Sequence, residues 1–275
     1  MISINTNYGG LFATKAANSS QRLMDTAMER LSSGKRINYA KDDAAGIQVA
    51  MRLEAEIQGL NMASKNAADA QAMLDTADGA LAEVHSALLR IRELALQAAN
   101  STVTDADRTS MQAEVQALED EIDRIGDNTT WGGQNILKQD LAAKFHIGPD
   151  AADNISVTIK EVSATGTVAT GGLSLTSDIT TQTKAAGYIT FVDNAISIIS
   201  TNRGNLGANS NRLTSTINNL DQIRVNLQAS KGRVMDANFA TETSNLARSQ
   251  ILQQAATAML AQANASKQTV LTLIR

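Results

Sequence analysis

The chain has 275 residues, with no cysteine, one proline, 3% aromatic residues and a net charge of −4. The missing cysteines exclude a disulfide, a thiolate zinc site and a cysteine nucleophile, and the basic residues are too sparse, without interleaved aromatics, for a nucleic-acid partner. Proline costs about 3 kcal/mol inside a helix, so its near absence permits long uninterrupted helices, while no stretch approaches the roughly 18 apolar residues needed for membrane insertion.

The N-terminal segment carries an apolar stripe of helical spacing at Leu23, Ala27 and Leu31, which ends before the Ser-Ser-Gly of residues 32–34. Residues 1–8 lack the basic and apolar regions of a secretory signal peptide. If the protein leaves the cell, we therefore expect secretion without a cleaved signal peptide.

The strongest pattern predicts a helix over residues 44–100, about 80 Å long at 1.5 Å per residue. Asp42 and Asp43 are its candidate N-caps. Apolar residues alternate in steps of three and four, forming a coiled-coil-like seam whose many alanines permit close helix approach. The seam consists of Leu60, Ala63, Ala67, Ala70, Leu74, Ala77, Leu81, Val84, Leu88, Ile91, Ala95 and Ala98.

A second helix is predicted after the polar break at residues 100–102. Thr104 and Asp107 form a candidate capping box, and the same spacing continues at Met111, Val115, Leu118, Ile122 and Ile125. Because the connection is short, we expect this helix to fold back on the first. Glu119, Asp120 and Glu121 are interpreted as a solvated helix face.

The region from about 129 to 180 differs, since it gathers glycine and threonine and holds the only proline, Pro149. Residues 155–159 alternate apolar and polar side chains with period two, which predicts a strand within a small set of hairpins.

Helical spacing resumes at Val192 and continues with leucines every seven residues, up to a candidate hinge or helix stop near Lys231-Gly232. The last segment has another seam with steps of four and three. We interpret the following members of it as an assembly seam: Leu252, Ala256, Met259, Ala263, Val270 and Leu273. The predicted fold is mainly α, a long antiparallel coiled-coil-like rod bundle with a small β-hairpin region and termini that pair as helices on assembly.

No motif for catalysis or for a cofactor is present. The two histidines, His85 and His146, have no partner at a metal-ligand spacing, so we expect no enzyme activity, no cofactor and no metal. The terminal seams are rich in small and polar residues and bury little area for their length, which favours ordering against other copies. Self-complementary ends that do not close into a ring generate helical filaments.

Several segments carry a family resemblance. Residues 31–46 and 90–95 closely resemble the N-terminal motifs of bacterial flagellins, and residues 236–242 and 250–254 resemble the C-terminal ones. This similarity implies a subunit that polymerises into the helical filament of the bacterial flagellum, for motility. It also implies an extracellular location reached by the flagellar type III export apparatus.

The resemblance implies a short form without large outer domains, organised in four parts. Residues 1–44 and 231–275 would be the two segments of an inner core domain. Residues 45–180 would be the first half of a rod domain, with two helices and the β region at about 129–180, and residues 181–230 its long C-terminal helix. The implied partners are other copies, the filament cap protein, the hook-filament junction protein and an export chaperone at the C-terminal segment.

The rod surface of flagellins is recognised by the vertebrate Toll-like receptor 5, and Arg90, Leu94 and Glu114 match the principal positions. Contacts between filament subunits are an alternative role for Arg90 and Glu114. The alternative functions are a hook-filament junction protein, which shares the two-ended plan, or a secreted adhesin or carbohydrate-binding protein that uses the threonine-rich centre.

Overall fold

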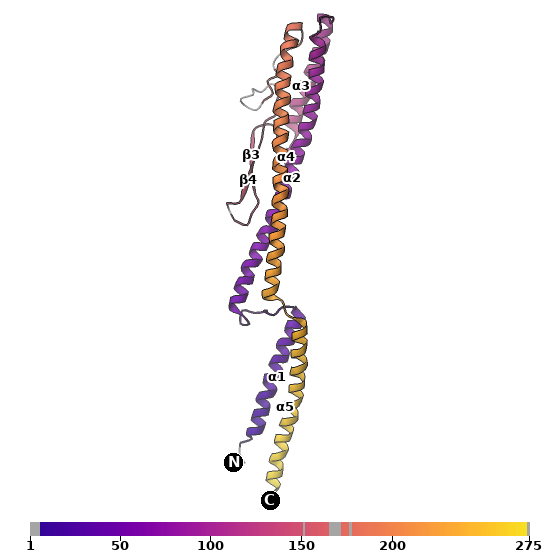
Figure 1. The fold of residues 1–275 in the computed structure, drawn as a ribbon. Coiled ribbons are helices and arrows are strands. Elements are labelled where there is room, and N and C mark those ends of the chain that lie inside the picture. The colour runs from indigo at the N-terminus through magenta and orange to yellow at the C-terminus, as the bar shows by residue number, and fades with distance from the viewer. Residues whose placement is uncertain (1–5, 151, 165–171, 176–177, 274–275) are drawn as a thin grey trace. The chain divides into compact units, whose positions relative to one another are not determined.

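The structure is a computed structural model that describes residues 6–150, 152–164, 172–175 and 178–273, with side chains up to Ser266. The chain divides into two compact units. The first combines Met1–Ile57 with Val225–Arg275, and the second is Gln58–Arg224. Long helices dominate, and two small antiparallel sheets lie in the second unit (Figure 1). The predicted mainly helical fold with small hairpins is confirmed.

The first unit pairs the two ends of the chain. Helices α1 (Tyr8–Ser33) and α5 (Phe239–Leu273) run antiparallel, as shown by the ion pair of Arg30 with Glu242 and by the hydrogen bond that Gln253 donates to Gln21. The Asn7 side chain caps the first turn of α1 by accepting a hydrogen bond from the backbone of Gly10. Gly34 ends this helix with φ of 69°, the left-handed conformation that glycine adopts without steric cost.

Two connectors in the same unit are hydrogen-bonded to each other. The backbone N–H of Arg36 donates to Met235 O at 2.6 Å, and that of Ala237 donates to Gly34 O at 3.0 Å. The Arg36 guanidinium adds a bond to the carbonyl of Val234 at 2.8 Å. The connector that follows α1 is therefore tied to the one that precedes α5.

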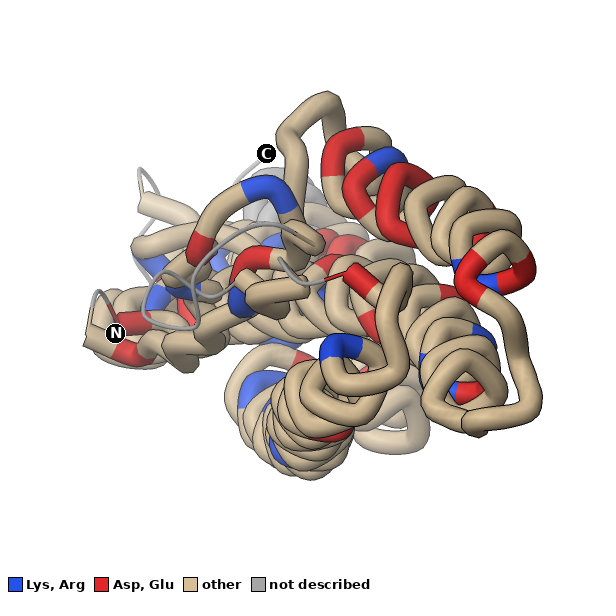
Figure 2. Tube along the Cα trace, turned by 90° about the horizontal axis from the view of Figure 1, so that it is seen from above, with Lys and Arg blue, Asp and Glu red and all other residues tan. Residues whose placement is uncertain are grey.

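Helices α2 (Ala44–Ala98) and α4 (Gln182–Met235) pair antiparallel. In the second unit, Arg92 bonds to Asp193 and Asn61 accepts from Arg224. Positively and negatively charged positions are interspersed over the described helices (Figure 2), as expected for helices joined by such pairs. The predicted seam of α2 is confirmed, since its members from Leu60 to Ala98 are buried.

The ends of α2 and α4 differ in how closely they match the predictions. Asp43 caps α2 by accepting a hydrogen bond from the Gly46 N–H at 2.8 Å, whereas Asp42 instead accepts from the N–H groups of Asn38 and Tyr39. The helix end expected near residues 231–232 comes three residues later, because the α4 backbone bonds continue through Gly232 and the helix ends at Met235.

Helix α3 (Asp105–Asn128) folds back on α2, as predicted. The capping box is formed: Thr104 accepts from the N–H of Asp107, and the Asp107 carboxylate accepts from the N–H of Thr104. Val115 and Ile122 are fully buried in the core of the second unit.

The β region consists of two hairpins. Strands β1 (Thr130–Trp131) and β2 (Gln134–Asn135) are joined by two glycines with positive φ, as a tight hairpin turn requires. Strand β3 (Leu141–His146) pairs with β4 (Asn154–Ile159) in a register that sets Ala143 opposite Val157. The strand predicted at 155–159 is confirmed, and its three apolar side chains are buried.

Candidate functional site

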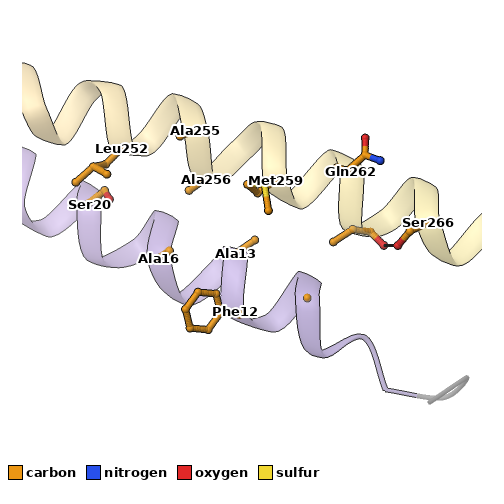
Figure 3. A pocket seen from close by; sticks show the side chains of 12 residues that line it. Phe12, Ala13, Ala16, Ser20, Leu252, Ala255, Ala256, Met259, Gln262 and Ser266 are labelled. Carbon is orange, nitrogen blue, oxygen red and sulfur yellow. Dashed lines mark hydrogen bonds between the residues drawn. The ribbon is translucent and has the colours of Figure 1, made fainter. Parts of the chain in front are cut away.

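An apolar groove lies between α1 and α5, within the first unit (Figure 3). It has a volume of about 410 Å³. Small side chains such as Ala13, Ala16 and Ala256 form its floor, because they allow the two helix backbones to approach each other. Larger apolar side chains, Leu252 and Met259 among them, lie along its edges.

The structure divides the predicted assembly seam between two environments. Ala256 is buried, and Ala263 is half-buried beside Gly9, where an added Cβ would lie 3.4 Å from the Ala263 Cβ. Leu252 and Met259 remain 46% and 64% exposed. The alanines therefore serve the pairing of α5 with α1, and the larger side chains remain available for another partner. Val270 and Leu273 belong to α5 but lie outside the described side chains.

Further apolar side chains of the two terminal helices are exposed. On α1 they include Leu11, Phe12 and Leu23, and on α5 they include Ile251. Phe12, with 76% of its surface exposed, also lines the groove. Large apolar side chains that stay exposed beside an apolar groove indicate an interaction site. The seam pattern missed Phe12 and Leu11, although two adjacent large apolar residues on a helix cannot both face one partner and so were a signal of a second contact.

Two of the three positions matched to receptor recognition, Arg90 and Glu114, lie where α2 and α3 meet. The Arg90 guanidinium bonds to the Glu114 carboxylate at 2.8 Å and to the Glu93 carboxylate at 3.1 Å. The side chains of Arg90, Glu93 and Glu114 are each about half exposed or more. The hydrogen bonds that Arg90 donates to Glu114 and, to a lesser extent, to Glu93 raise the pKa of Arg90, which is therefore fully charged. The structure thus brings Arg90 and Glu114 together at the surface.

Leu94 lies elsewhere. It is one helical turn after Arg90 on α2, and its side chain is 2% exposed within the core. It can only fix the turn that presents Arg90. Sequence reasoning missed Glu93, although its spacing of three residues from Arg90 is the one at which helical side chains meet.

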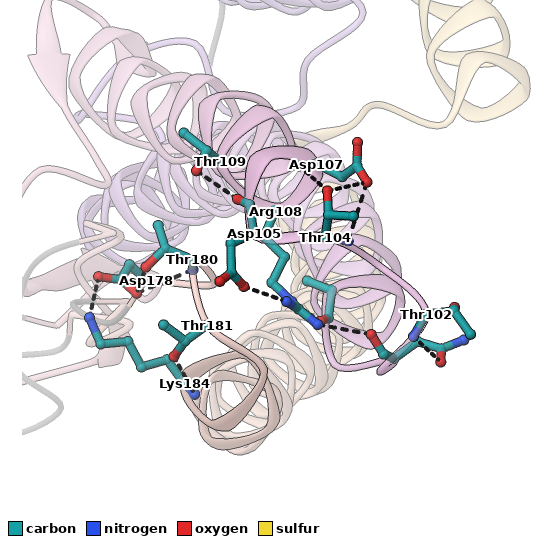
Figure 4. A network of polar contacts seen from close by, with 12 residues as sticks. Thr102, Thr104, Asp105, Asp107, Arg108, Thr109, Asp178, Thr180, Thr181 and Lys184 are labelled. Carbon is teal, nitrogen blue, oxygen red and sulfur yellow. Dashed lines mark hydrogen bonds and ion pairs between the residues drawn. The ribbon is translucent and has the colours of Figure 1, made fainter.

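A buried arginine fixes the start of α3 and hence the helix that carries Glu114 (Figure 4). The Arg108 guanidinium donates to the carbonyls of Ala98 at 2.7 Å and Asn100 at 3.0 Å, and it pairs with Asp105 at 2.6 Å. Its side chain is 6% exposed. The Ala98 carbonyl belongs to the C-terminal end of α2, where helical acceptors lack partners within the helix. The Asn100 carbonyl lies in the turn that follows this helix.

A second buried polar contact joins α3 to α4 and corrects an expectation. Glu119 was expected on a solvated face, but it is 5% exposed and accepts a hydrogen bond from the hydroxyl of the fully buried Tyr188. Desolvation raises the pKa of Glu119. The error arose because Glu119 was interpreted together with its two acidic neighbours. Its position, four residues after Val115 and three before Ile122, follows the spacing of the buried face.

No cluster of three or more potential metal ligands occurs among the described residues. Within the same part of the chain, none of the helices combines the length and the apolar character that crossing a membrane requires. The described features are those of a mainly helical structural protein: long paired rods, an apolar groove between the chain ends, and a charged surface where two rod helices meet.

Comparisons with known proteins identify the class of this structural protein. The bacterial flagellin N-terminal helical region matches residues 4–142, and the bacterial flagellin C-terminal helical region matches residues 189–274. A flagellin of Halalkalibacterium halodurans is 42% identical over 252 residues, covering 90% of this chain and 91% of the relative. A flagellin of Bacillus subtilis is 39% identical over 302 residues, covering 99% of each.

A solved structure described as a flagellar hook-associated protein, from Vibrio parahaemolyticus, has a TM-score of 0.59 and covers 71% of this chain and all of its own. At 14% identity it shows a shared fold alone. The chain belongs to the bacterial flagellin family. It is a structural, non-enzymatic subunit of the extracellular filament of the bacterial flagellum, which serves motility. Its length of 275 residues is that of a form without large outer domains.

Proposed function

We propose that the groove between α1 and α5 is the surface through which copies of the chain join into the filament. The observation that carries this proposal is that α1 and α5 are already paired and still expose Phe12, Leu252 and Met259 along the groove. Full burial of each such side chain contributes about 1.5–3 kcal/mol. Several of them are needed to exceed the roughly 4–15 kcal/mol cost of association, so a continuous surface is required.

A charge placed in this groove tests the proposal. In Met259→Glu the folded subunit is unperturbed because Met259 is exposed, but a carboxylate must be buried on assembly. Thr257→Glu is the matched control, since Thr257 is exposed on the same helix and does not line the groove. We expect seeded polymerisation, followed by sedimentation and electron microscopy, to be abolished in the first variant and retained in the second. Normal polymerisation of Met259→Glu, or equal loss in both, would refute the assignment.

We also propose that the terminal segments and the rods have separate roles. Residues 1–44 and 231–275 would form the inner core of the filament, with residues 45–180 and 181–230 as the two halves of the rod domain. Family membership supports this division. Removal of residues after Gly232 should abolish polymerisation and leave most of the helical circular dichroism signal in place, because α2, α3 and most of α4 remain.

A second role is proposed for the junction of α2 and α3, namely recognition by Toll-like receptor 5. Its support is the surface pair of Arg90 with Glu114, held on a turn that the buried Leu94 anchors. An exposed ion pair contributes at most about 1 kcal/mol to stability, so both members can be changed without unfolding the chain.

The receptor test compares two ion pairs that share helix α2. Arg90→Ala combined with Glu114→Ala should lower signalling in receptor-expressing cells by tenfold or more. Arg92→Ala combined with Asp193→Ala removes another exposed ion pair, at 2.6 Å, on a different face. This control should leave signalling within about twofold of the parent, which corresponds to a change of ~0.4 kcal/mol in binding free energy. An unchanged response in the first variant would remove the receptor assignment.

The remaining partners are proposed from family membership alone. They are the filament cap protein, the hook-filament junction protein and an export chaperone that binds the C-terminal segment, with export through the flagellar type III apparatus. The exposed Ile251 and Leu252 of α5 offer such a chaperone an apolar surface. Direct binding of purified chaperone to the chain, and loss of that binding after removal of residues 250–275, is the corresponding measurement.

A further inference from the structure

A hollow of about 320 Å³ lies between α2 and α4 in the second unit, apart from both sites described above. Its lining is mainly polar. Two carboxylates come from α2, Asp75 and Asp78, and the facing helix contributes Arg203, Gly207, Ser210 and Asn211. The hollow therefore presents charged and hydrogen-bonding groups to any molecule that binds in it.

The charges in the hollow are not balanced. Arg203 donates two hydrogen bonds to the Asp78 carboxylate, at 2.7 and 3.2 Å, and this contact raises the pKa of Arg203. Asp75 is exposed, and no hydrogen bond or ion pair joins it to another of the described residues. With one pair neutralised, Asp75 gives the hollow a net negative charge that suits a cationic side chain.

Glycines beside the hollow point to close approach by another molecule. Gly79, Gly204 and Gly207 lie in helix interiors, where glycine costs about 1 kcal/mol relative to alanine. A Cβ added at any of them would meet nothing within 4 Å, so packing within the chain does not require them. At Gly126, in contrast, an added Cβ would lie 2.3 Å from the carbonyl oxygen of Val162. Of these glycines Gly207 lines the hollow, and its missing side chain leaves room there for a partner against the backbone of α4.

We propose that this hollow receives an arginine or lysine side chain from a second copy of the chain. The inference rests on the self-assembly of the flagellin family, which makes another copy the partner present at the highest local concentration. The chain carries suitable donors: Arg52 and Lys65 are exposed on α2, and neither is paired with a carboxylate among the described residues. The hollow thus adds a rod-to-rod contact to the contacts made by the terminal groove.

Charge reversal at Asp75 tests this contact in the full-length chain. Asp75→Lys should raise the critical concentration for seeded polymerisation at least tenfold while leaving monomer circular dichroism and melting temperature unchanged. Asp69→Lys is the matched control, because Asp69 is exposed and unpaired on the same helix within the described part but does not line the hollow. It should remain within about twofold of the parent, or ~0.4 kcal/mol.

A second pair of variants tests the space rather than the charge. Gly207→Leu fills the hollow, whereas Gly187→Leu places the same side chain at another open glycine of α4. Only the first should impair polymerisation. Parent-like polymerisation of both Asp75→Lys and Gly207→Leu, or equal impairment of test and control, would overturn the inference. If the unmodified chain itself failed to elongate seeds, the failure would lie in self-assembly and not in this contact.

Discussion

Replacement of Arg108 by alanine should be among the most destabilising changes at a charged residue of this chain. The side chain is 6% exposed and donates to two carbonyls, Ala98 O at the end of α2 and Asn100 O in the turn that follows. Hydrogen bonds from a charged donor contribute about 1.5–3 kcal/mol each, so the loss of two at the lower value is about 3 kcal/mol. The pair with Asp105 adds little, because that carboxylate is 82% exposed. For a unit of this size the melting temperature should fall by roughly 6–12 °C.

Arg124→Ala provides the control for this prediction. Arg124 lies on the same helix and also pairs with a carboxylate three residues before it, Glu121, at 2.6 Å, but its side chain is 61% exposed. Its removal should cost less than about 0.5 kcal/mol. The assay is thermal and urea unfolding followed by far-ultraviolet circular dichroism. Equal shifts in the two variants would refute the argument that burial and carbonyl capping, rather than the ion pair, give Arg108 its effect.

Three further predictions concern the second unit. Desolvation raises the pKa of Glu119, so the folded state binds the proton of this carboxyl more tightly than the unfolded state does. The free energy of unfolding should therefore increase as pH falls from neutral towards the ordinary carboxyl range. Urea titrations at several pH values should show a smaller increase in Glu119→Gln. Leu94→Ala should cost about 2–5 kcal/mol in urea unfolding, whereas the neighbouring, exposed Leu89→Ala should stay within about 0.5 kcal/mol. Gly126→Ala, whose Cβ would meet a backbone carbonyl, should destabilise by about 1–3 kcal/mol, while Gly79→Ala should leave monomer stability equal or slightly higher by thermal melting.

Helical seams and caps could be predicted because they depend on neighbours in the sequence. The spacing from Leu60 to Ala98 gave the buried face of α2, and Thr104 with Asp107 gave the start of α3. Each is a local pattern whose geometry follows from 3.6 residues per turn. The same holds for the alternation of β4, where three apolar residues reach the core.

Features that depend on a distant partner could not be predicted. The spacing that contains Ala256 and Met259 is uniform, yet one residue is buried against α1 and the other is exposed. An apolar repeat has the same form whether it packs on its own chain or on another copy. Glu119 likewise cannot be told from its solvated neighbours by sequence alone. Its burial depends on the hydroxyl of Tyr188, 69 positions away, which donates a hydrogen bond to its carboxylate.

The long sequence separation between the partners of the first unit has a consequence for biosynthesis. Arg30 meets Glu242 across 212 positions, and Asn7 meets Asn264 across 257. Both α1 and α5 line the groove, so neither helix can form it alone. A prematurely terminated product without α5 would therefore lack the surface proposed for polymerisation. On that proposal, the pairing of the two terminal helices would keep incomplete chains out of the filament.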